Sequence, residues 1–110
     1  MNPGSDFCCV FVTVPNMVAA RKIASAALKL KLAACANLMP RIESHYWWEG
    51  KLESSSEVLM IFKTMRTSLE PLEACVVGNH PYETPEFLVL GVDQGNLKYL
   101  DWIKGSLKTE

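Results

Sequence analysis

Residues 78–87, GNHPYETPEF, bring several chemically active side chains into one short segment, called here the His80 loop. They are one imidazole, one phenol and two carboxylates, on His80, Tyr82, Glu83 and Glu86. Such groups transfer protons or hold ligands. Pro81 disfavours a helical backbone at His80, so the imidazole can point into a cleft, and the two prolines stiffen the loop. The loop is therefore a candidate binding site, and the alternative is a turn with a hydrogen-bonded histidine and solvated acids.

Lys63 is a further candidate, because it interrupts the end of an apolar segment. Its amine could neutralise Glu86 or meet an anionic ligand; the alternative is a lysine whose stem lies on apolar surface while the amine reaches water. His45 is expected at the surface. The sequence contains no glycine-rich phosphate loop, no H-E-x-x-H pair and no nucleophile elbow. Since nothing aligns a nucleophile with the acid–base groups, we expect no enzyme.

The composition excludes several other classes of function. A formal net charge of -1 gives no general attraction to nucleic acid or acidic membranes. The apolar runs, such as VLMIF at 58–62, are far shorter than the ~18 residues typical of a membrane span. The four cysteines lack a C-x-x-C spacing, and the polar start MNPGSD does not resemble a secretory leader. We therefore expect free thiols in a reducing compartment, the cytoplasm.

The hydrophobic pattern predicts the elements that position these side chains. Residues 7–14, FCCVFVTV, are almost wholly apolar, which is typical of a central strand buried on both faces. Asn16 then caps a helix of about four turns. The apolar positions of this helix recur at helical spacing, on Ala20, Ile23, Ala27 and Leu30. Residues 32–48 change to strand periodicity, and Glu49–Gly50 turns the chain into the next strand at 56–64.

The second half of the chain predicts two more helices and one more strand. Residues 67–78 form a helix capped by Ser68 and closed by Gly78. Residues 86–92 form another buried strand. Residues 95–107 form the last helix, which begins at an asparagine N-cap.

The order β-α-β-β-α-β-α is that of a split βαβ, or ferredoxin-like, α+β fold. Right-handed crossovers place two helices on one face of a four-stranded antiparallel sheet, and the last helix follows at the C-terminus. We expect one domain over residues 1–110, with residues 1–6 flexible.

The strand predicted at 33–48 is too long for its own domain. At ~3.3 Å per residue it spans roughly 53 Å, whereas a compact chain of this length has a diameter of roughly 34 Å. The hairpin must bend at Pro40, which cannot donate to a ladder, or project beyond the body. Its end carries Tyr46, Trp47 and Trp48. We expect another copy of the chain to cover this end by β-augmentation, and the alternative is a hairpin folded back on its own sheet.

Four segments together resemble the CutA family, known as divalent-cation tolerance proteins. They are VTVPN, KLAACANLMPRIESHYWWEGKLESSSEVLMIFKT, NHPYETPEF and QGNLKYLDWI, in the family's order and spacing over residues 10–107. The match is strongest to animal members. The resemblance implies a homotrimer with long hairpins that wrap neighbouring subunits, and no established catalytic reaction. Animal members are linked to acetylcholinesterase assembly, which implies a protein partner.

The resemblance also implies binding of copper or another divalent metal ion. Copper is coordinated well by imidazole and, when reduced, by thiolate. We therefore predict His80 as a ligand, with Cys35, the one thiol inside a matching motif, as the second. A site at a subunit boundary can draw ligands from two chains. The alternative is a hydrogen-bonded His80 and a Cys35 that serves as a small core residue.

In such a trimer, the His80 loop is expected to line a cleft at the subunit boundary. Tyr82 combines a hydroxyl with an aromatic body, which suits the rim of a cleft. We predict that Tyr82 and Glu86 face Lys63. Glu83 shares the loop, and Trp102 of the last helix lies nearby. The same arrangement supports an alternative function, a trimeric small-molecule sensor with its ligand site between subunits.

Overall fold

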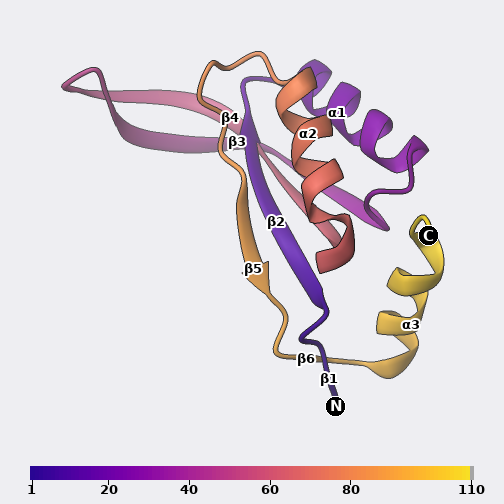
Figure 1. The fold of residues 1–110 in the computed structure, drawn as a ribbon. Helices are drawn as coiled ribbons and strands as arrows, with labels where there is room; N and C mark the ends of the chain where they lie inside the picture. Colours follow the sequence, from indigo (N-terminus) through magenta and orange to yellow (C-terminus); the bar gives the residue numbers. More distant parts are fainter. Residues whose placement is uncertain (110) are drawn as a thin grey trace.

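The structure, a computed structural model, describes residues 1–109. A four-stranded sheet forms its centre, and a long hairpin leaves the sheet on one side (Figure 1). In chain order the elements are β1 (Asn2–Pro3), β2 (Phe7–Val14), α1 (Met17–Lys29), β3 (Cys35–Trp48), β4 (Lys51–Met65), a 3-10 turn (Arg66–Ser68), α2 (Leu69–Asn79), β5 (Leu88–Gly91), β6 (Gln94–Gly95) and α3 (Leu97–Ser106).

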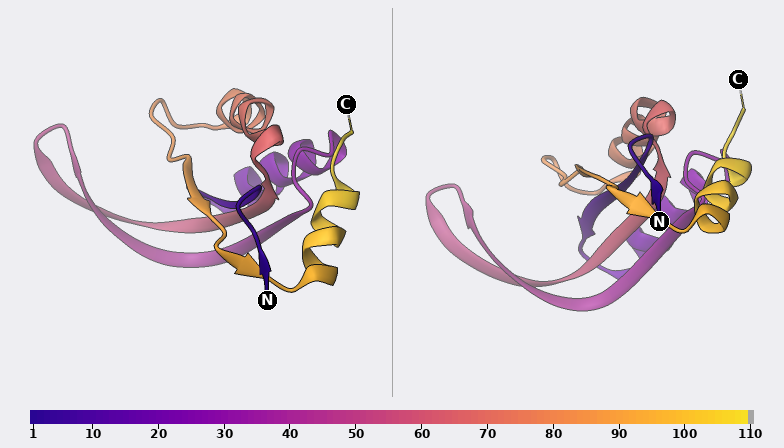
Figure 2. Two further views of the ribbon diagram at one scale, coloured as in Figure 1. Left: turned by 60° about the horizontal axis from the view of Figure 1, so that its bottom comes forward. Right: turned by 90° about the horizontal axis from the view of Figure 1, so that it is seen from below.

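The main sheet has the strand order β3-β4-β2-β5, and every neighbouring pair is antiparallel. Helices α1 and α2 lie together on one face of it, as both views in Figure 2 show. Apolar side chains fill the layer between them, among them Val10, Val12, Ile23, Met60, Phe62, Leu72 and Val76. The predicted ferredoxin-like α+β fold is confirmed.

Helix α1 begins where its N-cap was predicted. The Asn16 side chain accepts the main-chain N–H of Ala19 over 2.9 Å, which satisfies one of the free N–H groups of the first turn. Ile23 and Ala27 are buried as the spacing indicated. The prediction for Leu30 is wrong: it caps the C-terminus of the helix and is 58% exposed, because the helix ends before its side chain can turn towards the sheet.

Helix α2 is not capped by Ser68. That residue has a near-helical backbone at the end of the 3-10 turn and makes no side-chain capping bond, because the chain is already coiled before the α-helix begins. The helix also runs past Gly78 and ends at Asn79. The asparagine cap of α3 is confirmed, since Asn96 accepts the N–H of Tyr99 over 3.2 Å.

Strand β2 is central but buried on one face only. Val10, Val12 and Val14 face the helices and are fully buried, whereas Phe11 and Thr13 alternate with them and are half-buried. The expectation of burial on both faces is therefore wrong within one chain. We call the face of the sheet opposite α1 and α2 the outer face.

Strand β5 is an edge strand rather than a buried one. Its Leu88, Val89 and Leu90 are 58%, 41% and 43% exposed, although their sequence is wholly apolar. β5 pairs with β2 on one side and ends the strand order on the other, so that its second side has free main-chain groups.

The β3–β4 hairpin turns at Glu49 and Gly50, whose φ angles of 50° and 77° give the tight two-residue turn that suits twisted strands. Its register shifts between Met39 and Ile42, and Arg41 has a φ of 68° there. A bulge thus lies at Pro40, where a bend was one of the two expectations. The hairpin curves and projects from the body in all three ribbon views, and the molecule measures 44 × 27 × 21 Å (Figures 1 and 2).

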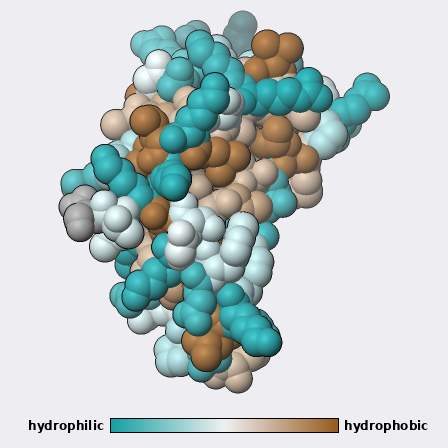
Figure 3. Space-filling view, turned by 90° about the vertical axis from the view of Figure 1, so that its right-hand side faces the viewer, coloured by the Kyte–Doolittle hydropathy of each residue, from teal (hydrophilic) through white to brown (hydrophobic). Residues whose placement is uncertain are grey.

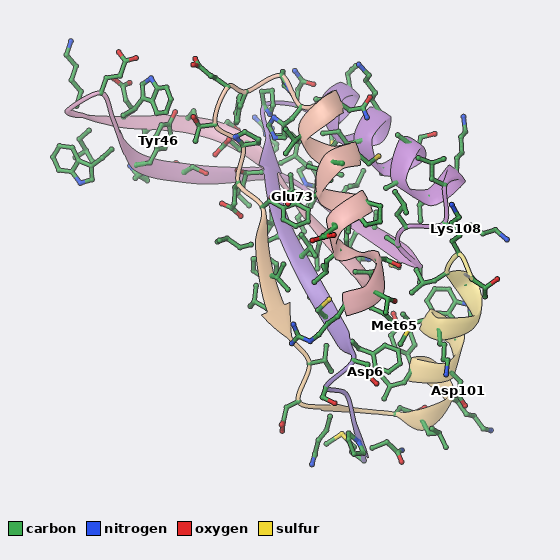
Figure 4. The ribbon with its side chains drawn as sticks, in the orientation of Figure 1. Asp6, Tyr46, Met65, Glu73, Asp101 and Lys108 are labelled. Carbon is green, nitrogen blue, oxygen red and sulfur yellow. The ribbon has the colours of Figure 1, made fainter. Side chains whose placement is uncertain are left out.

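The projecting part of the hairpin carries large apolar side chains into solvent. Trp47 is 73% exposed, its cross-strand partner Leu52 is 66% exposed and Trp48 is 47% exposed. Figure 4 places Tyr46 on the same projecting part. Because the two adjacent tryptophans point to opposite faces, one local core cannot bury both.

The chain ends lie on the other side of the body. Asn2 and Pro3 pair with Gly95 and Gln94 in a small second sheet, and Leu100 of α3 is buried beside Gly95. On the side that carries α1 and α3, hydrophobic surface appears between hydrophilic side chains (Figure 3). No helix within residues 1–109 has the length and apolar character to cross a membrane.

Two glycines provide a matched test of the backbone. We expect Gly50→Ala to lower the free energy of unfolding by about 1–2 kcal/mol, because a Cβ strains a left-handed backbone. Gly78→Ala should raise it by about 0.5–1 kcal/mol, since this helical glycine has open space around it. Thermal unfolding of both variants at one protein concentration measures the difference. Two changes of the same sign would contradict the turn geometry.

Candidate functional site

The imidazole of His80 is held at both ring nitrogens. Its Nε2 donates to the main-chain carbonyl of Thr13 over 2.8 Å, and its Nδ1 accepts the main-chain N–H of Tyr82 over 3.0 Å. A carbonyl only accepts and an amide N–H only donates, so the two bonds require the neutral tautomer with its proton on Nε2. A metal ion can bind this ring only by replacing one of the two bonds.

The end of β5 explains why His80 is used in this way. The ladder between β2 and β5 stops at the pair Phe11 and Leu88, and the Thr13 carbonyl lies beyond it. His80 follows α2 with an extended backbone, which turns its ring towards that carbonyl. The histidine therefore supplies the hydrogen bond that the sheet lacks after β5 ends.

The structure does not bring His80 and Cys35 together within one chain. Cys35 pairs across the β3–β4 ladder with Lys63, whereas Thr13, the partner of His80, pairs with Leu59. Four residues of strand, about 13 Å, separate these two positions. Within residues 1–109, no three His, Cys, Asp or Glu side chains are grouped to hold a metal ion. His80 and Cys35 of a single chain thus do not form a copper site in this arrangement. Copper binding through His80 and Cys35 stays a prediction.

The other members of the His80 loop line a cavity of about 640 Å³ beside the hairpin. Tyr82, Glu83 and Glu86 come from the loop, and Tyr46, Trp48 and Glu57 come from β3 and β4. The Tyr82 hydroxyl donates to Glu57 Oε2 over 2.7 Å, and Glu57 is only 8% exposed. Sequence reasoning missed Glu57. The only signal was its place in the strand, where Glu57 shares the outer face of β4 with Leu59 and Ile61, and this did not indicate the contact with Tyr82.

The cavity is acidic. Burial raises the pKa of the Glu86 carboxyl above its ordinary value, and the nearby Glu57 carboxylate raises it further. Burial, followed by the hydrogen bond to Glu57, also raises the pKa of the Tyr82 phenol, which therefore stays a donor at neutral pH. Neither lysine nor arginine occurs among the described residues that line the cavity. His45 also lines the cavity, but its ring contacts Glu43 rather than these carboxylates.

Lys63 and Trp102 lie elsewhere in the chain. The Lys63 amine donates to the Tyr99 hydroxyl over 3.2 Å, and this bond is the largest cause of the raised pKa of the lysine. The Tyr99 and Trp102 rings lie 5.5 Å apart. Six residues of β4, about 20 Å, separate Lys63 from Glu57. Within one chain, Lys63 and Trp102 therefore lie apart from Tyr82 and Glu86. That a neighbouring subunit brings these two groups together in one cleft stays a prediction.

Together these features define a ferredoxin-like α+β chain with a projecting hairpin and an acidic cavity at the base of that hairpin. A family model described as CutA1 divalent ion tolerance protein matches residues 8–106. The chain belongs to the CutA family of divalent-cation tolerance proteins.

Curated relatives from plants, animals and bacteria match at similar identity. The rice Protein CutA 1, chloroplastic, is 48% identical over 99 residues, covering 90% of this chain and 56% of that protein. The human Protein CutA is 47% identical over 102 residues, covering 93% of this chain and 56% of that protein. An Escherichia coli divalent-cation tolerance protein CutA is 46% identical, with 90% and 88% covered. The chain thus spans little more than half the length of the rice and human relatives.

Solved structures agree with the family assignment. CutA1 from Oryza sativa superposes with a TM-score of 0.91 at 44% identity, over 99% of this chain and 97% of that one. The divalent cation tolerance protein from Thermus thermophilus gives 0.90 at 36% identity, over 93% and 99%.

The two histidines of the chain allow a direct comparison. His80→Ala should lower the free energy of unfolding by about 1–3 kcal/mol, because the Thr13 carbonyl and the Tyr82 N–H lose their partner. His45→Ala should change it little, because the side chain is 60% exposed and its contact with Glu43 is screened by water. Urea unfolding at one protein concentration measures both. If both variants changed the free energy of unfolding equally, the proposed structural role of His80 would be wrong.

Proposed function

We propose that this chain acts in divalent-cation tolerance as a homotrimer, in which each hairpin is covered by a neighbouring chain. The observation that carries the proposal is the projecting end of the hairpin, where Trp47 and Leu52 form an exposed apolar pair. Such a strand pair in water promotes association, because its apolar faces and free main-chain groups gain partners there. A monomer leaves both uncovered.

The two ends of the sheet suit a closed ring. β3 stands at one end of the strand order and β5 at the other, and each has a side without a strand partner in the main sheet. When the hairpin of one chain meets the β5 side of the next, the contact is head-to-tail. Three such contacts close into a ring and leave no free edge, which is how a heterologous interface avoids a filament.

The trimer predicts a particle of three times 12.3 kDa in solution. Introducing Trp47→Glu together with Leu52→Glu should convert it to smaller species, because four carboxylate oxygens cannot be buried without partners. Val18→Glu is the matched control: Val18 is also exposed, at 76%, but lies on α1 in the body. Size exclusion with light scattering at micromolar concentration gives the masses.

Three results would count against this assembly. A monomeric wild-type protein would exclude the trimer. A double variant that remains as large as wild type would show that the hairpin end does not hold the particle together. Dissociation of the Val18→Glu control would mean that the assembly uses the face of α1 instead.

Copper binding, the second part of the proposed function, depends on assembly of the trimer. A single chain engages both nitrogens of His80 and keeps Cys35 about 13 Å further along the sheet. Ligands from two chains are therefore needed to complete a site, and copper, which is coordinated by imidazole and thiolate, suits the types of these residues. This proposal concerns binding only and assigns no reaction to the metal.

Copper titration by calorimetry tests this dependence. Wild type should bind, while His80→Ala and Cys35→Ser should bind at least tenfold more weakly, as expected when one ligand of a small set is lost. His45→Ala should bind as wild type does. The dissociated hairpin variant should lose binding. If it retains the wild-type affinity, the metal site lies within one chain; if trimeric His80→Ala does so, His80 is not a ligand.

A further inference from the structure

The cavity beside the hairpin has aromatic walls. Tyr46 and Trp48 contribute from β3, and Tyr82 contributes from the His80 loop. All three rings are partly exposed, at 39%, 47% and 37%. A volume of about 640 Å³ lies in the range of sites that bind small molecules. An aromatic ring presents negative potential on its face, so these walls favour a cation over an anion.

The position of Tyr82 in this wall is fixed before any ligand arrives. Its hydroxyl donates to Glu57, its main-chain N–H donates to His80, and its ring lies 4.8 Å from the imidazole, centroid to centroid. A wall held by three contacts loses little freedom when a ligand binds. The part of the wall that Tyr82 forms is therefore preformed.

The charge of the cavity has the same sign as its ring faces. Glu57, Glu83 and Glu86 line it, and Glu57 is 8% exposed. Within residues 1–109, Glu86 has no hydrogen bond or ion pair, although it is half-buried. His45 also lines the cavity, but its Nε2 lies 2.7 Å from the carboxylate of Glu43. A ligand with positive charge relieves the repulsion between Glu57 and Glu86.

The donor geometry favours an organic cation over a metal ion. A hard divalent cation takes six or more oxygen ligands, and the described residues hold no group of three carboxylates, imidazoles or thiols placed for a metal. The Glu57 carboxylate also already accepts the Tyr82 hydroxyl. A protonated amine needs fewer partners, since it can donate to one carboxylate while its hydrocarbon part contacts a ring.

We propose that the cavity between the His80 loop and the hairpin binds a small organic amine in its protonated form. The ammonium donates to Glu86 and Glu57, and the apolar part lies against Trp48 and Tyr46. The amine would act as a ligand rather than a substrate, since no bond is made or broken. All of these residues belong to one chain, and Tyr46 and Trp48 lie on the hairpin face opposite Trp47. The proposal therefore rests on a trimer in which the neighbouring chain covers the Trp47 face and leaves the cavity open.

Benzylamine is a suitable first ligand, because it combines one ammonium with one aromatic ring. We expect it to shift amide resonances of residues 80–86 and the Trp48 indole N–H in protein NMR at pH 7.5. A dissociation constant on the order of 1 mM is expected for a ligand of this size. Benzyl alcohol, which has the same shape without the charge, should bind at least tenfold more weakly.

Three variants locate the site. Glu86→Gln should weaken benzylamine binding about tenfold, as expected for the loss of a charge-assisted hydrogen bond. Trp48→Leu should weaken it about two- to fivefold through the loss of the aromatic face. Glu53→Gln removes the same charge from an exposed hairpin residue outside the cavity, and should leave binding unchanged. Size exclusion checks that each variant keeps the wild-type assembly.

Several outcomes would overturn the proposal. Equal binding of benzylamine and benzyl alcohol would show that the carboxylates do not recognise the ligand. Equal weakening by Glu53→Gln and Glu86→Gln would show a general charge effect. Calcium chloride that shifts the same resonances and displaces benzylamine would make the cavity a metal site. Binding retained in both Glu86→Gln and Trp48→Leu would place the amine elsewhere.

Discussion

The fold depends on the continuity of strand β4, which belongs to two ladders at once. From Val58 to Met65 it pairs with β2 in the centre of the sheet, and from Lys51 onward it pairs with β3 in the hairpin. The inner residues Met60 and Phe62 are fully buried against the helices, so this part of the strand cannot slide. The projecting hairpin therefore inherits its direction from a buried core.

The His80 loop is attached at the point where β4 changes its role. Glu57 is the last residue before the pairing with β2 begins, and it accepts the Tyr82 hydroxyl there. On the other side of the loop, the His80 ring bonds the Thr13 carbonyl beyond the end of β5. Loop, hairpin and sheet edge thus share two side-chain hydrogen bonds, and the acidic cavity exists because these contacts hold its walls.

Local patterns could be predicted from the sequence because they depend on near neighbours. The asparagine caps, the bulge at Pro40 and the Glu49–Gly50 turn all follow from backbone preferences within a few residues. The prediction of a Ser68 cap was wrong because the preceding 3-10 turn already has a helical backbone. In each case the local conformation decided the outcome.

Contacts between distant segments could not be predicted in the same way. The apolar sequence of β5 indicated burial, but its place at the end of the strand order is a property of the whole sheet. Glu57 appeared to be an ordinary strand acid, since the phenol that contacts it comes from a loop 25 residues away. The hydrogen bond from His80 to Thr13 depends on where β5 ends, and the sequence of the His80 loop does not indicate that position. The family resemblance identified the relevant segments without giving these contacts.

Because of the bulge between Met39 and Ile42, the orientation of the hairpin side chains depends on the number of residues in the strand as well as on their types. Side chains alternate between two faces along a strand, so one residue inserted or removed at this point exchanges the faces of Trp47 and Trp48 while every side chain keeps its identity. The seven residues from Ile42 to Trp48 extend about 23 Å, and a tilt of about 10° at their base moves their end by about 4 Å. A small change of geometry at the bulge therefore produces a large displacement of the hairpin end. The bulge determines both the position of that end and which of the two tryptophans points to each face.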